Sequence, residues 1–178
     1  MLTCFQFKDM NMLDHGLAVH KKYEDIWLYL QRGTCPSCHW DIPDDTFKRL
    51  MNIMPRTLNP TDAKNYCVYH DCGKHLVEYY DDKGRKHFPD HANKSADRWK
   101  ECGGDELTEH LIRSDMLLHT CKGENLKALK NHSEIETLLI TAWAEIHANA
   151  EMFGGIQSTS FKIKKKQLIK ATNIIGIF

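Results

Sequence analysis

The sequence predicts an all-α protein, a compact helical bundle with one small β-hairpin. Apolar residues recur every three or four positions along several segments, and capping residues, glycine or proline bound these segments. One stretch, LVEYYDDKGRKHF, instead has two β-prone arms around an Asp–Lys–Gly turn, which is typical of a hairpin. A chain of 178 residues is long enough to bury a core of its own. We therefore expect a single domain spanning 1–178.

The first part of the chain predicts three helices after a short lead-in of ten residues. The first helix starts at Asp14, which can cap it, and ends at Gly33. A short irregular segment leads to a second helix over DDTFKRLMNIM, which Pro55 ends. The sequence NPTD, starting at Asn59, opens a third helix that leads into YHDCGKH.

The second part predicts further helices after the hairpin. A helix over HANKSADRWKEC ends at a Gly–Gly pair, and Asp105 opens the next one. The longest helix is expected from about Ser133 to Phe153. The core should span about 12–153, with a basic C-terminal segment over 158–178 that contains SFKIKKKQLIK.

Composition narrows the functional class. Lysine plus arginine equals aspartate plus glutamate, and this balance argues against a generic nucleic-acid or membrane-surface binder. No stretch approaches the about 20 apolar residues of a membrane span, and no signal peptide is recognisable, so we expect a cytoplasmic protein without a membrane partner. Seven cysteines, an odd number, indicate reduced thiols. Eleven histidines exceed chance expectation and point to a site rich in imidazole.

Histidines and carboxylates fall on helix faces that should point inward. His15 starts the apolar stripe of the first helix, and Asp115 continues a leucine stripe, with His119 one turn beyond. A buried carboxylate is costly unless it is paired or binds a cation. Imidazoles and carboxylates that converge from several helices form a mixed nitrogen–oxygen site, which suits a divalent transition metal.

The motif YHDCGK resembles the hallmark of the HD-domain metal-dependent phosphohydrolases. From HDCGKHLVEYYDDKGRKHFPDHANKSADRWKECGG to DELTEHLIRSDMLLH, the chain resembles more closely the HD domains attached to some bacterial tRNA nucleotidyltransferases. Shared features are His–Asp–x–Gly–Lys, a hairpin with an Asp–x–Gly turn, Phe–x–x–His and a small-residue helix. The resemblance covers about 12–153, and its specific part is 67–119.

The resemblance implies an all-helical HD fold and a set of metal ligands. The ligands carried over are His15, His70, Asp71, His91 and Asp115. Further ligands to be considered are His119 and Glu145. The final aspartate usual on the last core helix has no obvious counterpart, so the last ligand is either Asp115 or Glu145. One or two divalent ions are expected, drawn from Mn, Fe, Ni, Co, Zn or Mg.

The expected activity is hydrolysis of a phosphate ester through metal-activated water. Asp71 would bind metal and orient the water, while Lys74, one turn later, would bind phosphate as a point charge. Arg113 is a weaker phosphate-binding candidate, because it lies two residues before Asp115 and projects to another side of its helix.

The substrate is expected to be a small-molecule nucleotide or a phosphorylated nucleic-acid end, attacked at a phosphomonoester or cyclic phosphodiester. The sequence leaves two alternatives open, an HD-fold di-iron oxygenase and a non-catalytic binding module that a metal only stabilises. It leaves the oligomeric state open.

A second motif is Cys35–Pro–Ser–Cys38–His39. Its spacing matches covalent haem attachment, but that chemistry belongs to exported proteins. It also offers half of a zinc site, although no second Cys–x–x–Cys follows. We interpret these residues as reduced thiols in a loop.

Overall fold

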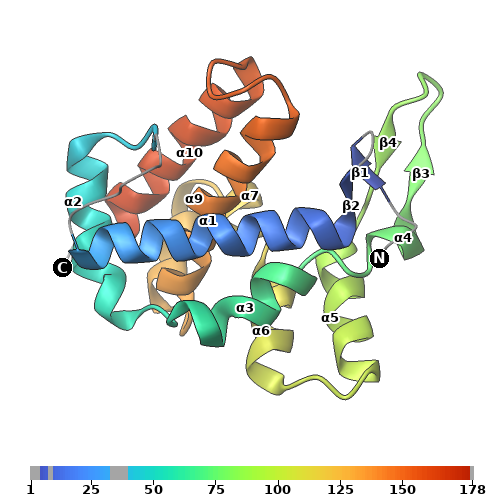
Figure 1. Cartoon of the computed structure of the whole chain (residues 1–178), viewed down its shortest axis with the longest axis horizontal. Helices are drawn as coiled ribbons and strands as arrows, with labels where there is room; N and C mark the ends of the chain where they lie inside the picture. The colour runs from blue at the N-terminus through green and yellow to red at the C-terminus, as the bar shows by residue number, and fades with distance from the viewer. Residues whose placement is uncertain (1–4, 8–9, 33–39, 177–178) are drawn as a thin grey trace.

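The computed structural model describes residues 5–7, 10–32 and 40–176, and these residues form a mostly helical fold (Figure 1). The helices are α1 (Met12–Arg32), α2 (Asp44–Ile53), η1 (Met54–Arg56), α3 (Pro60–Tyr69), α4 (Lys74–Val77), α5 (His91–Glu101), α6 (Glu106–Ser114), α7 (Leu117–Thr120), α8 (Gly123–Ala128), η2 (Leu129–Asn131), α9 (Ile135–Met152) and α10 (Thr159–Ile175). The strands are β1 (Phe5–Phe7), β2 (Met10–Asn11), β3 (Tyr79–Tyr80) and β4 (Lys86–His87).

Helix α1 is the central element of the arrangement. It runs across the face shown in Figure 1, with α3 below it and α9 crossing behind it, and it packs against both. Helix α10 packs on α9, while α5 and α6 pack on each other. Since α1, α3, α5, α6 and α9 all meet around one region, side chains from segments far apart in the sequence can converge there.

Helix α9 forms the middle of the core, because most of its residues are buried on every side. Trp143 is fully buried, and its indole N–H donates to Thr172 Oγ1 of α10 at 3.1 Å. Phe161 and Leu168 bring the apolar face of α10 into the same core. The basic C-terminal segment therefore contributes to the core instead of lying outside it.

The prediction of a mostly helical fold with a small hairpin is confirmed. Strands β3 and β4 pair antiparallel around the predicted turn, and this hairpin projects at the upper right of Figure 1. Asn59 caps α3 by accepting from two backbone N–H groups, and Asp105 caps α6 by accepting from Thr108 N–H. Capping residues therefore located these helix starts correctly.

Three sequence-based details were wrong. Asn11, not Asp14, caps α1, because Asn11 Oδ1 accepts from the N–H groups of Leu13 and Asp14. Helix α1, with 21 residues, is longer than α9, with 18. The expected lead-in contains β1 and β2, which pair antiparallel.

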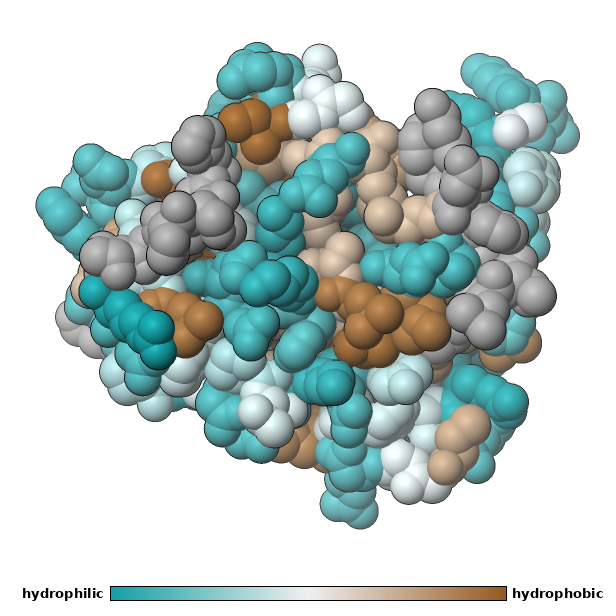
Figure 2. Space-filling model, in the orientation of Figure 1, coloured by the Kyte–Doolittle hydropathy of each residue, from teal (hydrophilic) through white to brown (hydrophobic). Residues whose placement is uncertain are grey.

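The surface seen in Figure 2 is mainly hydrophilic, with small separate hydrophobic patches. No helix within the described ranges has the length and apolar character needed to cross a membrane. The Cys35–Cys38–His39 motif lies outside the described residues.

Candidate metal centre

Two glycines bring the backbones around the candidate site into close contact. A Cβ at Gly16 would lie 2.1 Å from the carbonyl oxygen of Val68, so only glycine lets α1 approach α3 this closely. A Cβ at Gly73 would lie 2.5 Å from the backbone of Lys94 and Ser95, at the contact between α4 and α5. These close approaches place His15 beside the residues that follow α3.

His70 and Asp71 lie at the end of α3, where the chain turns toward α4. The Nδ1 atom of His70 donates to the carbonyl oxygen of Cys67 at 2.8 Å, because a carbonyl can only accept. This bond leaves Nε2 directed at the site, 3.3 Å from Asp71 Oδ2. His15 Nε2 lies 3.7 Å from the same oxygen. A ring oriented by its other nitrogen is typical of metal-binding histidines.

His91 approaches Asp71 from the other side. Its Nδ1 donates to the carbonyl oxygen of Phe88 at 2.9 Å, and its Nε2 lies 3.6 Å from Asp71 Oδ1. The two oxygens of Asp71 therefore face different histidines. Such an arrangement suits a carboxylate that bridges two ions.

Glu145 joins the site from α9. One ligand atom each from His15, His70 and Glu145 lies within 4.8 Å of the other two, so these three residues could hold a metal ion. His119 Nε2 lies 3.1 Å from Glu145 Oε2, and Asn149 Nδ2 donates to Glu145 Oε1 at 3.1 Å. Both contacts orient the Glu145 carboxylate.

Asp115 reaches the site at the end of α6. Its Oδ1 accepts a hydrogen bond of 2.7 Å from the hydroxyl of Tyr66, which is itself fully buried. Burial raises the pKa of Asp115, whereas His70 acts to lower it. Asp115 lines the same cavity as Asp71 and Glu145.

The structure brings together the ligand candidates of the helical core, whereas Cys35, Cys38 and His39 lie outside the described residues. We call these core candidates the histidine–carboxylate cluster: His15, His70, Asp71, His91, Asp115, His119 and Glu145.

The cluster contains buried polar atoms that have no hydrogen-bond partner among the described residues. They are both ring nitrogens of His15, His70 Nε2 and Asp71 Oδ1. An unsatisfied buried donor or acceptor costs about 1–3 kcal/mol, so a folded protein rarely keeps several together. Nitrogen and oxygen donors of this kind fit a bound divalent cation.

The electrostatics of the cluster also fit a cation. Burial lowers the pKa of His15 to about 4, so its ring is neutral, as a metal ligand must be. Burial acts to lower the pKa of His70 too, but Asp71, Asp115 and Glu145 raise it to about 10. The carboxylates therefore create a negative potential that favours a positive charge at this position.

Lys74 neutralises part of that potential. Its Nζ lies 2.6 Å from Asp71 Oδ2 and 5.3 Å from the centre of the Phe88 ring. Lys74 is buried and lines the cavity, so its ammonium group lies close to the position of a ligand that enters.

A cavity of about 490 Å³ opens onto the cluster. Met116, which precedes α7, and apolar side chains of α9 form part of its wall, and the start of α10 forms another part. This volume lies within the about 300–1,000 Å³ of small-molecule sites.

The structure does not bring Arg113 to the cavity. Its guanidinium donates to Asp97 and Glu109 at 2.9 Å each, and it is not among the lining residues. Arg113 lies two residues before Asp115, and this offset turns it toward α5 and solvent. The sequence made Arg113 the weaker phosphate-binding candidate for this same reason, and its position in the structure agrees.

The sequence did not identify two residues that support the cluster. Tyr66 precedes His70 by four residues, and Asn149 follows Glu145 by four residues, so each shares a helix face with a cluster residue. A search for polar side chains at that spacing could have found both.

The fold and the cluster define a mostly helical protein with a candidate metal centre beside a cavity. Comparison with protein-family models, curated proteins and solved structures gave no match to this chain.

Proposed function

We propose that this protein is a divalent-metal-dependent phosphohydrolase of the HD-domain type. Its substrate would be a nucleotide or nucleotide-derived phosphate ester, either a phosphomonoester or a cyclic phosphodiester. The observation that carries the proposal is the convergence of buried, unpartnered imidazole and carboxylate atoms beside a cavity. A purely structural metal site is closed by protein ligands, so the adjoining cavity favours a catalytic role.

His15, His70, Asp71 and Glu145 would hold the first metal ion. When bound, a divalent cation supplies a water of lowered pKa and a positive charge for the phosphate oxygens. Asp71 would orient the attacking water, and the neutral His15 ring would stay deprotonated. His119 and Asn149 would keep Glu145 in position through the contacts described above.

Lys74 would bind the phosphate group. Its ammonium already lies beside Asp71, so a phosphate oxygen near the metal ligands would also lie near Lys74. A lysine acts on phosphate as a compact point charge with three donors. The buried position of Lys74 strengthens this interaction, because water screens it little.

The direct test is a screen of phosphate esters with metal-depleted protein to which manganese, nickel, cobalt or magnesium is added back. We expect metal-dependent release of phosphate, or ring opening of a cyclic phosphodiester, for at least one nucleotide. Protein that binds these metals but hydrolyses none of the esters would contradict the proposal. Iron-dependent oxygen consumption under the same conditions would favour the oxygenase alternative instead.

Replacing Lys74 with glutamine is expected to leave the metal content unchanged and to lower the hydrolysis rate by about 10²–10³-fold. A loss of this size is typical when an enzyme loses one donor that stabilises charge in the transition state. Part of the loss should appear as a higher KM, because Lys74 also binds the ground-state phosphate. Lys94→Gln, at an exposed position on neighbouring α5, is the matched control. Loss of metal in Lys74→Gln would show that Lys74 supports the cluster instead of the substrate.

His91 distinguishes one ion from two. Among the histidines that the structure describes, His91 faces Asp71 Oδ1, whereas His15 and His70 face Oδ2. If a second ion binds between His91 and Asp71, His91→Ala should halve the metal content measured by elemental analysis. His75→Ala, at an exposed position on α4, should keep the full content. Equal metal content in the two variants would rule out the second ion.

A further inference from the structure

One part of the cavity wall comes from the end of α9 and the start of α10. These lining residues combine aromatic rings with polar groups: Phe153, Ser158, Ser160, Phe161, Lys164 and Gln167. The lysines here belong to the basic C-terminal segment. One of them, Lys164, faces the cavity, and its position gives it a specific role.

Lys164 differs from the other lysines of α10. It is partly buried at the cavity wall, whereas Lys162 and Lys166 are exposed. Lys165 forms an ion pair with Asp41. Lys164 makes no hydrogen bond or ion pair with any residue that the structure describes. Its ammonium is therefore open to a ligand in the cavity.

Lys164 and Lys74 reach the cavity from helices far apart in the sequence, α10 and α4. Lys164 of α10 lines this cavity together with Glu145 of α9. Lys74, by contrast, pairs directly with Asp71. The cavity thus has two separate cationic residues, of which Lys74 pairs with Asp71 and Lys164 comes from the other helix.

Charge balance shows why two ammonium groups matter. The cavity is lined by three carboxylates, Asp71, Asp115 and Glu145, and by two lysines. One divalent ion is enough to change this balance from negative to positive. A single phosphate held by the metal and Lys74 would leave Lys164 without a direct ion-pair partner among the described residues.

We propose that Lys164 is a specificity-determining residue, which binds a second phosphoryl group of the substrate while the first lies at the cluster and Lys74. This inference rests on the proposed function, because it assumes a phosphate at the metal centre. It predicts that substrates with two phosphoryl groups bind better than those with one.

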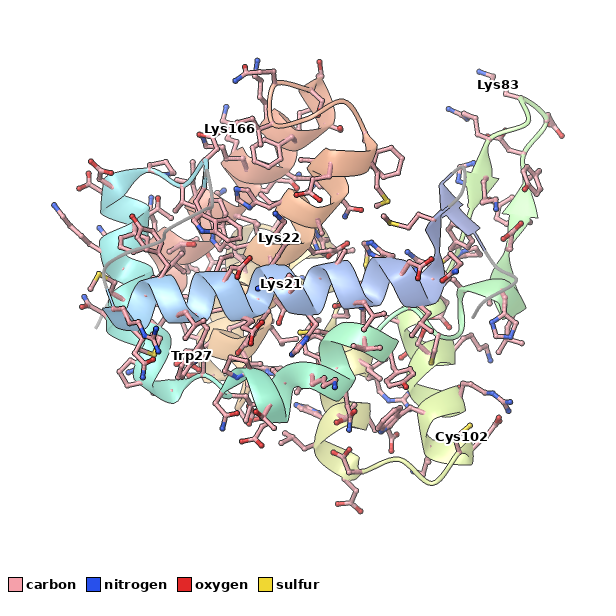
Figure 3. The ribbon with its side chains drawn as sticks, viewed as in Figure 1. Lys21, Lys22, Trp27, Lys83, Cys102 and Lys166 are labelled. Atoms are coloured by element: carbon pink, nitrogen blue, oxygen red, sulfur yellow. The ribbon has the colours of Figure 1, made fainter. Side chains whose placement is uncertain are left out.

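The test compares two non-hydrolysable probes, methylphosphonate and methylenediphosphonate, by calorimetry on the manganese-loaded protein. The wild type is expected to bind the diphosphonate more tightly. Lys164→Gln should weaken diphosphonate binding by about tenfold or more, as expected for loss of one charged hydrogen bond. Methylphosphonate binding and metal content should change less than about twofold. Lys166→Gln is the matched control, since Lys166 projects outward from the same helix (Figure 3).

The outcomes separate this inference from the proposed function. An equal loss for both probes, or none for either, would overturn the second-phosphoryl site while leaving the phosphohydrolase proposal intact. Metal loss in Lys164→Gln would assign Lys164 to the cluster and also overturn the inference. If the wild type binds neither manganese nor methylphosphonate, the proposed function fails, and this inference fails with it.

Discussion

Replacing Asp71 with asparagine is expected to abolish both metal binding and hydrolysis. Asp71 has His15 and His70 near one of its carboxylate oxygens and His91 near the other. The amide keeps the size of the side chain but removes its charge. Replacing a residue that only hydrogen-bonds to a metal ligand typically lowers metal affinity by roughly 10–100-fold. Replacing Asp71, a ligand itself, should lower the affinity by more than this. Elemental analysis and the ester assay measure both effects.

Folding must be separated from metal loss, because Asp71→Asn leaves the buried Lys74 without its carboxylate partner. Breaking a buried ion pair in this way costs about 3–5 kcal/mol. The double variant Asp71→Asn/Lys74→Gln removes both charges, so it should recover stability but not metal. Asp82→Asn, at an exposed position in the hairpin, should behave as wild type. Near-normal metal content in the folded double variant would show that Asp71 is not a ligand.

Replacing Gly16 with alanine is expected to destabilise the protein and weaken its metal site together. The added Cβ would overlap the backbone of Val68, which cannot move as a flexible side chain could. Overpacking at such a contact costs about 3 kcal/mol, equivalent to a fall in Tm of roughly 6–12 °C for a chain of this size. Because α1 must shift, His15 should move away from His70, and the affinity for manganese should fall.

Leu17→Ala is the matched control for this variant. Leu17 is adjacent to Gly16 on α1 but is 46% exposed. Such surface changes stay within about 0.5 kcal/mol, so its Tm and manganese affinity should remain close to wild type. Unchanged values in both variants would mean that α1 does not approach α3 closely at this position.

The helical fold could be predicted because local signals agree with tertiary packing. Asn59 and Asp105 cap the helices that they were expected to cap, and Gly84 lies in the hairpin turn with a positive φ of 70°. The start of α1 could not be assigned in this way. Asn11 and Asp14 are both suitable caps, and only the backbone geometry decides between them.

The membership of the cluster was predictable in part. Helical spacing places His15 and Asp115 on inward faces, and the HD motif places His70 and Asp71 together. Helical spacing also puts Glu145 on an inward face, but whether it is close to His15 and His70 depends on how α9 crosses α1, which no local pattern encodes. For the same reason, the sequence showed a basic segment but not which lysine faces the cavity.

The most direct test of the central claim is a titration of metal-depleted protein with Mn²⁺, in which electron paramagnetic resonance measures the free ion. We predict saturable binding of one or two ions per chain, and we predict that Asp71→Asn/Lys74→Gln loses this binding. Wild-type protein that shows no saturable binding, or a folded double variant that binds as the wild type does, would contradict the assignment of the histidine–carboxylate cluster as a metal centre.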